Sequence, residues 1–232
     1  LFGKGSTGGV VNQVNKQPFL MEQNEFNVTA GSGEMYRLTG DFNKPLGENA
    51  AMRINAMVHK AENWGAKVDK KGVAGSYRWG IGERDEYTVG LYHLETDGRP
   101  LYAHPWMVSN GGLTNNGPRN SGANTTGTLV PVLDARNYYG MASDYNDSGA
   151  NIATLSHTHR FGQDSELKTQ ARVGRFTRDM RASTIRLGNA SLQPNGEAVT
   201  LENFGPDTVL TRGNQFKIQD MSVAQIQSDF SN

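Results

Sequence analysis

The chain opens with Leu1-Phe2 and then runs Gly3-Lys4-Gly5-Ser6-Thr7-Gly8-Gly9-Val10-Val11-Asn12-Gln13-Val14-Asn15-Lys16-Gln17-Pro18. This stretch contains a formal G-x-G-x-x-G spacing, which in dinucleotide-binding proteins follows a strand and opens a helix. Here the glycines are followed by a β-type run over residues 10–14 and then by Lys-Gln-Pro, so no helix is expected. The spacing therefore does not predict a nucleotide site. The stretch is interpreted as a glycine-rich region that leads into a strand ended by Pro18.

Downstream of Pro18, apolar and polar residues alternate with a period of two, which predicts β-strands with one apolar and one polar face. The predicted strands lie near 22–31, 35–43, 50–62, 72–82, 86–95, 150–161, 166–179 and 214–230. The apolar face is expected to gather Tyr36, Leu38, Met52, Ile54, Val58, Tyr77 and Trp79. The polar face is expected to gather Arg37, Asp41, Arg53, Asn55 and Arg78.

The links between these strands differ in length. Those at 31–33, 44–49, 83–85 and 162–165 are short, whereas those at 63–71, 96–149 and 180–213 are predicted to be long and to lie on one edge. Short turns at one end and long loops at the other are typical of outer-membrane β-barrels. Aromatic residues near the short-turn end fit an interfacial girdle: Phe42, Trp79, Tyr87 and Phe161. A soluble β-sandwich also alternates apolar and polar residues, so the pattern alone leaves both folds open.

Composition excludes several other classes of protein. The 23 basic and 23 acidic residues cancel, so the chain has no general charge for binding nucleic acid. No run approaches about 18 apolar residues, so no transmembrane helix is expected. The mean hydropathy of −0.60 is compatible with a barrel, because lumen-facing positions are polar. Cysteine is absent, which excludes disulfides and thiolate metal sites.

The opening stretch closely resembles the end of the plug domain of TonB-dependent siderophore receptors. In that family a glycine-rich run leads into a strand of the form GGV-I/V-N-x-V-x-K-x-P. Five residues match this motif one by one, namely Gly8, Gly9, Asn12, Lys16 and Pro18, and Val11 stands where isoleucine is commonest. In this interpretation the glycines allow close backbone approach where the plug packs against the barrel wall.

The resemblance extends over essentially the whole chain. Residues 36–43 (Tyr-Arg-Leu-Thr-Gly-Asp-Phe-Asn) resemble the second barrel strand and its periplasmic turn. Residues 137–145 resemble the end of the long loop before the sixth strand, and residues 157–161 (His-Thr-His-Arg-Phe) resemble the lower end of that strand. The similarity is closest to receptors for iron-catecholate siderophores.

The resemblance implies an all-β fold: an antiparallel up-and-down meander of about eight strands from a larger transmembrane barrel, open, with long loops on one edge. Residues 1–20 would be the C-terminal tail of the plug domain, and residues 21–232 the N-terminal part of the barrel. Because Leu1 is not a methionine and the last residues lie in an apparent strand, the chain is expected to be a fragment.

The intact protein would be a monomeric outer-membrane receptor that imports a ferric siderophore, and not an enzyme. TonB would act through an N-terminal region that precedes this chain, and lipid and lipopolysaccharide would surround the barrel. The resemblance implies no resident cofactor and no nucleic-acid partner. Two other classes stay open: a passive porin or adhesin-like barrel, which would lack a plug, and a soluble β-sandwich binding domain, which would need no detergent.

In the family, long loops line the extracellular vestibule, where aromatic and cationic side chains hold an anionic iron chelate. The candidates here are Tyr102, Trp106, Arg136, Tyr138 and Tyr139. Tyrosine and tryptophan at these positions would also fit an outer girdle of aromatic residues.

His157 and His159 lie two residues apart and therefore share one face of a strand, which could present two imidazoles to a metal ion. No third ligand stands near them in the sequence, so no metal site is predicted. No Ser-His-Asp, paired-carboxylate or Walker arrangement stands out, so no catalytic residue is predicted either.

Overall fold

The structure is a computed structural model, and it describes residues 15–101, 106–108, 129–131, 134, 136–162, 164–186, 193–197, 202–209 and 211–232. Every regular element in this part is a strand, and it holds no helix long and apolar enough to cross a bilayer. One sheet comprises β1 (Gln23–Gly31), β2 (Met35–Pro45), β3 (Ala50–Asn63), β4 (Ala66–Trp79), β5 (Asp85–Arg99), β8 (Tyr145–Arg160), β9 (Glu166–Arg186) and β10 (Thr211–Ser231).

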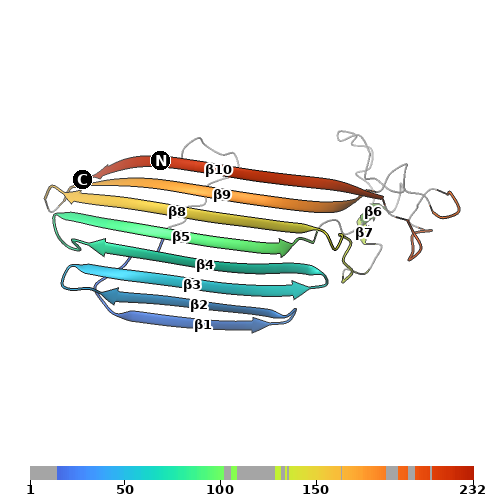
Figure 1. Ribbon diagram of the computed structural model, residues 1–232, viewed down its shortest axis with the longest axis horizontal. Coiled ribbons are helices and arrows are strands. Elements are labelled where there is room, and N and C mark those ends of the chain that lie inside the picture. Colours follow the sequence, from blue (N-terminus) through green and yellow to red (C-terminus); the bar gives the residue numbers. More distant parts are fainter. Residues whose placement is uncertain are drawn as a thin grey trace.

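Each strand of this sheet pairs antiparallel with the next one, in the order β1-β2-β3-β4-β5-β8-β9-β10 (Figure 1). Two short strands, β6 (Trp106–Val108) and β7 (Leu129–Pro131), pair with each other inside the link between β5 and β8. The predicted up-and-down meander is therefore confirmed. β1 and β10 stand at the two edges of the sheet, so the sheet is open within the described residues.

One predicted loop is a tight turn. The sequence predicted a long link at 63–71, but β3 continues to Asn63 and β4 begins at Ala66. Trp64 and Gly65 have φ angles of 48° and 86°, as in the two-residue turns with positive φ that match the twist of a hairpin. Charge on both faces of residues 67–71 made this segment look like a loop, whereas it forms regular pairs with β3 and β5.

The long links that remain connect β5 to β8 and β9 to β10. Both lie at the same end of the strands, which is called the long-loop edge below (Figure 1). The tight turns at 32–34 and 64–65 share that edge. The opposite end of the strands, called the short-turn edge below, carries the turns at 46–49, 80–84 and 161–165. The prediction of long loops on one edge is thus correct for two links and wrong for the third.

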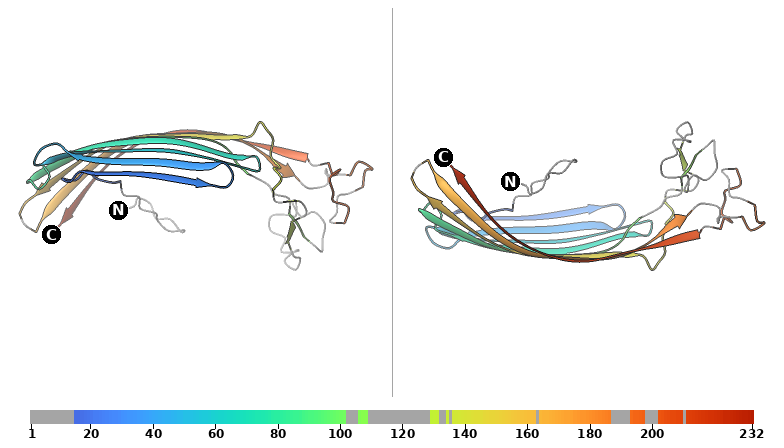
Figure 2. Two further views of the ribbon diagram at one scale, coloured as in Figure 1. Left: turned by 90° about the horizontal axis from the view of Figure 1, so that it is seen from below. Right: turned by 90° about the horizontal axis from the view of Figure 1, so that it is seen from above.

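The strand register confirms the two predicted faces. Leu38 pairs with Val58 and Met52 with Tyr77, so these side chains share a face. The sheet is curved, and the segment ahead of β1 lies on its concave side, against the face that carries Arg53 and Arg78 (Figure 2). The polar face is therefore concave and the apolar face convex.

Apolar side chains on the convex face are largely uncovered. The exposed large apolar residues of the described strands lie on this face, with Met221 as the exception: Phe26, Val28, Tyr36, Phe42, Ile54, Val58, Val73, Tyr77, Val89, Leu91, Leu155, Val173, Phe216, Ile218, Ile226 and Phe230. A layer with apolar residues outside and polar residues inside is the pattern of a membrane barrel wall. A β-sandwich buries its apolar face against a second sheet, whereas the other described strands, β6 and β7, have only three residues each and pair with each other in a link.

Aromatic rings form a row across the convex face near the short-turn edge. Tyr77, Trp79, Tyr87 and His157 stack in succession, with ring centroids 5.4, 5.2 and 4.5 Å apart. The row continues through His159 to Phe161 at 4.7 Å. Three of the four residues predicted to form a girdle are in this row, and such belts mark the interface between hydrocarbon and water.

β9 and β10 have 21 residues each, and toward the long loop that joins them their convex face carries charged as well as apolar side chains. Arg175 of β9 forms an exposed bidentate ion pair with Asp220 of β10 at 2.6 and 3.0 Å. Beyond it, Tyr145 donates a hydrogen bond to Asp179 at 3.0 Å. Charged side chains thus stand among exposed apolar ones here, since Ile218 pairs with Asp179 and Phe216 with Arg181.

Ile54→Arg is predicted to destabilise the folded barrel by about 2–4 kcal/mol, as expected for a cation facing hydrocarbon near the bilayer midplane. Ile54 lies four residues along β3 from Ala50, the partner of Trp79 in the aromatic row. At about 3.3 Å per residue and a strand tilt of about 40°, this places it roughly 10 Å above the row, inside an apolar band about 25 Å tall.

The measurement is a folding titration of the intact receptor in lipid vesicles. Asn55→Arg is the matched control, because the neighbouring residue faces the concave side opposite Asp41 and should accept a cation at little cost. Equal stabilities of the two variants would show that the convex face does not meet lipid.

Candidate functional site

The concave face holds the segment that precedes β1. Asn43, on the concave face of β2, is 1% exposed. Its side-chain oxygen accepts a hydrogen bond from the Phe19 N–H at 3.1 Å, and its amide donates to the carbonyls of Phe19 and Met21 at 2.8 and 2.6 Å. One side chain thus satisfies three backbone groups of a segment that has no strand partner, as buried polar groups require.

A bidentate ion pair stands beside Asn43. Arg53 of β3 donates from Nε and Nη2 to the two carboxylate oxygens of Asp41 at 2.8 and 2.7 Å. Both side chains are nearly buried, at 12% and 11% exposure. Arg53 also donates to the Gln17 carbonyl at 3.0 Å and lies 5.3 Å from the centre of the Phe19 ring. Lys16 completes the group with an ion pair to Asp41 at 2.5 Å.

A second ion-pair network continues along the same face. Arg78 of β4 donates to the Pro18 carbonyl at 3.0 Å and to Glu86 of β5 at 2.7 Å. Arg160 of β8 donates to the other carboxylate oxygen of Glu86 at 3.1 Å. The Glu86 side chain is 9% exposed, so two arginines compensate one nearly buried carboxylate. Three strands, β2, β3 and β4, therefore contact residues 16–21 directly, and β5 and β8 support Arg78 through Glu86.

The predicted junction motif is partly visible in this cluster. Lys16 forms the ion pair with Asp41, and Pro18 is fully buried with its carbonyl bonded to Arg78. The motif residues Gly8, Gly9 and Asn12 lie outside the described residues. The alternating pattern predicted that Asp41, Arg53 and Arg78 lie on the polar face, but it did not predict their contacts with the motif.

The end of the long link before β8 is anchored to the β3–β4 turn. The Arg99 guanidinium lies 5.3 Å from the Tyr138 ring centre and donates to the Gly65 carbonyl at 2.6 Å. Tyr138 donates to the Pro100 carbonyl at 3.4 Å, and burial raises the pKa of its phenol. A Cβ at position 65 would lie 2.8 Å from Tyr138, so this contact requires the glycine.

Asp144 fixes the same link to β9. Its carboxylate accepts hydrogen bonds from the Ser183 hydroxyl at 2.7 Å and from the N–H groups of Ser183 and Met141 at 3.0 Å. Burial acts to raise the pKa of the Asp144 carboxyl, but these hydrogen bonds outweigh it and hold the pKa below its ordinary value. The carboxylate therefore serves as a charged anchor.

The five predicted ligand contacts have different surroundings. Tyr102 lies outside the described residues, and Trp106 belongs to β6. Tyr139 is 7% exposed; it donates to the Asp134 carbonyl at 3.1 Å, and its own carbonyl accepts a hydrogen bond from Arg212. The Arg136 side chain is 70% exposed and paired with Asp134 at 2.6 Å. The structure thus brings Arg136, Tyr138 and Tyr139 together in one anchored segment at the long-loop edge.

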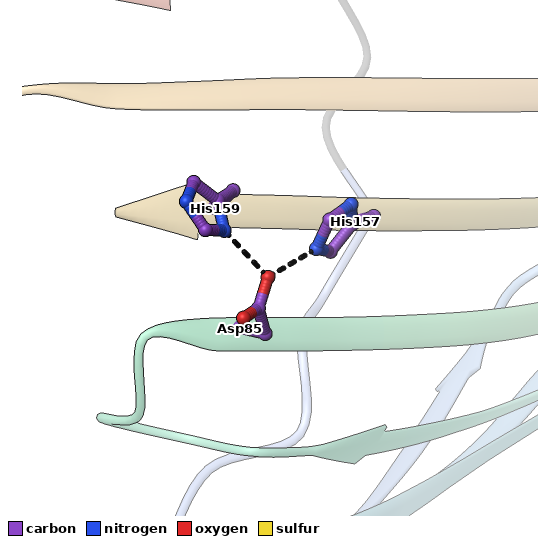
Figure 3. A group of neighbouring side chains, drawn as sticks. All are labelled: Asp85, His157 and His159. Atoms are coloured by element: carbon purple, nitrogen blue, oxygen red, sulfur yellow. Dashed lines mark hydrogen bonds and ion pairs between the residues drawn. The ribbon is translucent and has the colours of Figure 1, made fainter. Parts of the chain in front are cut away.

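A third cluster lies at the opposite edge, on the convex face. Asp85 Oδ1 is 2.8 Å from His157 Nε2 and 2.7 Å from His159 Nδ1 (Figure 3). The sequence indicated that the two histidines share a face but gave no third group beside them. Asp85 stands opposite His159 in the register of β5 and β8, so only the strand pairing reveals it.

No family model matches the chain, but several known proteins are similar to it in sequence. It is 26% identical over 204 residues to the catecholate siderophore receptor Fiu of Escherichia coli K12, covering 84% of this chain and 26% of that protein. It is 29% identical over 195 residues to the probable TonB-dependent receptor BfrD of Bordetella pertussis, covering 82% and 24%. A probable TonB-dependent siderophore receptor of Acinetobacter baumannii, PiuA, is 31% identical over 120 residues, covering 50% and 16%.

Solved structures give the same answer for the fold. The open form of the ferric-catecholate import receptor Fiu superposes with a TM-score of 0.75 at 24% identity, covering 93% of this chain and 32% of that one. The closed form gives 0.75 at 23% identity, covering 96% and 30%. The chain spans about a quarter of the length of the curated relatives that it matches first. By sequence and by fold, this chain is a homologue of the TonB-dependent receptors.

Proposed function

We propose that the chain is part of an outer-membrane receptor that imports a ferric siderophore by TonB-dependent transport. The observation that carries this proposal is the clamp formed by Asn43, Arg53 and Arg78 around residues 16–21 on the concave face. A segment held inside a barrel wall is what a plug requires where it joins the first strand. A passive pore would lack a plug, so this clamp would have nothing to hold.

We propose a domain boundary between residues 20 and 21, and the contacts of residues 16–19 with the concave face support it. Residues 1–20 form the tail of the plug, and residues 21–232 form the first part of the barrel. The apolar convex face meets outer-membrane lipid, with lipopolysaccharide around its upper part, because its exposed side chains need a cover other than water. TonB acts through residues of the plug domain that precede this segment, and the receptor works as a monomer.

The transported ligand is a ferric catecholate, which is the ligand class that the name of Fiu states for that relative. Such a chelate is anionic and aromatic, so it suits exposed arginine and aromatic side chains. We assign its first contact to Arg136 and name Tyr102, Trp106, Tyr138 and Tyr139 of the same link as further candidates; Tyr139 is 7% exposed, so its ring would have to be uncovered before it could contact the chelate. Arg136 is the strongest candidate, since its side chain is 70% exposed at the long-loop edge.

Asp41→Asn in the intact receptor is predicted to lower ferric-catecholate uptake about tenfold while leaving binding at the cell surface within about twofold. Removal of the carboxylate leaves Arg53 and Lys16 close together without their shared anion, which loosens the clamp at the base of the plug. The measurements are uptake of radioactive iron by energised cells and binding of the same complex to de-energised cells.

Two variants serve as controls for the clamp. Arg37→Gln removes a charge on the same face of β2, four residues from Asp41, and should leave uptake unchanged. The double variant Asp41→Asn/Arg53→Gln should lose less uptake than the two single losses combined, because the pair is removed together. Normal uptake by Asp41→Asn would contradict the clamp's role in transport.

Arg136→Ala is predicted to raise the Kd for the ferric catecholate about tenfold, which is the effect of losing one charge-assisted contact. Arg84→Ala removes an arginine from the turn at the opposite edge and should not change the Kd. The Kd values come from fluorescence titration of the purified receptor. Equal values for the two variants would remove Arg136 from the binding site.

A further inference from the structure

Three ligand-type atoms converge on the convex face near the short-turn edge. His157 Nε2, His159 Nδ1 and a carboxylate oxygen of Asp85 all lie within 4.8 Å of one another (Figure 3). The two histidines alternate with Thr158 near the end of β8, so the dyad repeat puts both rings on one face. Asp85 is the first residue of β5 and lies directly opposite His159. The pairing of β5 with β8 therefore places its carboxylate beside the two rings.

The packing of the two rings fixes their orientation. The His157 ring is stacked on Tyr87, with centroids 4.5 Å apart and an interplanar angle of 9°. The His159 ring meets Phe161 edge to face at 4.7 Å and 74°. Rings held by neighbours lose little freedom when they bind a ligand, which favours a preformed site. The side chains of Asp85, His157 and His159 are 42%, 38% and 24% exposed, and they belong to the aromatic row at the interface, so an ion can reach them from its aqueous side.

Two imidazoles and one carboxylate suit a borderline divalent cation such as Zn²⁺, Ni²⁺ or Cu²⁺, whereas Ca²⁺ and Mg²⁺ prefer oxygen ligands alone. With bonds of about 2.0–2.2 Å in a tetrahedral site, the ligand atoms must stand roughly 3.3 Å apart. The present N···O distances are 2.7 and 2.8 Å, so the cluster must open by about half an ångström. Rotation of the exposed Asp85 side chain can supply this opening.

We propose that Asp85, His157 and His159 form a binding site for one divalent transition-metal cation, with a fourth position open to water. The ion would join β5 to β8 at the edge opposite the long loops. The site is therefore separate from the concave clamp and from Arg136, and it does not depend on the function proposed above.

The test uses the intact receptor, folded in detergent, with Zn²⁺ as the probe. Equilibrium dialysis of the unaltered protein and of the His157→Ala/His159→Ala double variant should differ by one ion per receptor. His93→Ala is the matched control, because His93 is on the convex face of β5 with Asn151 and Glu95 as its neighbours. That variant should bind as many ions as the unaltered protein.

Asp85→Asn separates a metal site from a hydrogen-bonded carboxylate. The asparagine keeps a side-chain oxygen for the two imidazoles but removes the charged ligand, so the Zn²⁺ affinity of this site should fall at least about tenfold. Electron paramagnetic resonance with Cu²⁺ gives an independent readout: coupling to two imidazole nitrogens in the unaltered protein and to one in His157→Ala. Heat-modifiable migration on a gel checks that each variant is folded.

The proposal is overturned if the folded double variant binds the same number of Zn²⁺ ions with the same affinity as the unaltered receptor. It is also overturned if Asp85→Asn leaves both the Zn²⁺ affinity and the Cu²⁺ spectrum unchanged. In those cases the cluster is a carboxylate that accepts two imidazole N–H groups and nothing more.

Discussion

The backbone hydrogen bonds between neighbouring strands are the interaction on which this structure depends, because the described sheet is a single layer. In a single layer each side chain lies on either the concave or the convex face. The alternation of side chains along the strand, with a period of two, decides which face it is. A shift of one residue in the register would turn every apolar side chain to the polar side. The uninterrupted pairing of β9 with β10 over 21 residues shows how strictly the register is kept.

The same constraint explains why the clamp is made of side chains. Residues 15–21 have left the sheet, so their carbonyls have no ladder to join. Asn43, Arg53 and Arg78 replace that ladder with donors from three successive strands. Arginine suits this task because one guanidinium can bind a carboxylate with two donors and still reach a carbonyl. The carboxylates of Asp41 and Glu86 in turn hold the guanidinium groups in place.

Strand order, faces and the aromatic row could be predicted from the sequence, because each depends on alternation along one strand. Contacts between strands could not. Asp85 lies 72 positions before His157, and only the register of β5 and β8 makes them neighbours. The contact of Tyr138 with Gly65 likewise depends on two links that meet in space. The turn at Trp64 and Gly65 was missed because charges on both faces of the next residues imitate a loop.

The long strands β9 and β10 extend well beyond the aromatic row. On the convex face Arg175 pairs with Asp220, and beyond this pair the exposed apolar residues Ile218 and Phe216 stand opposite the charged residues Asp179 and Arg181. β9 continues to Arg186, which adds about 36 Å of strand and roughly 28 Å of height at a tilt of about 40°. In the proposed receptor the barrel wall would therefore project beyond the membrane. An incoming molecule would contact this wall before it reached the lipid.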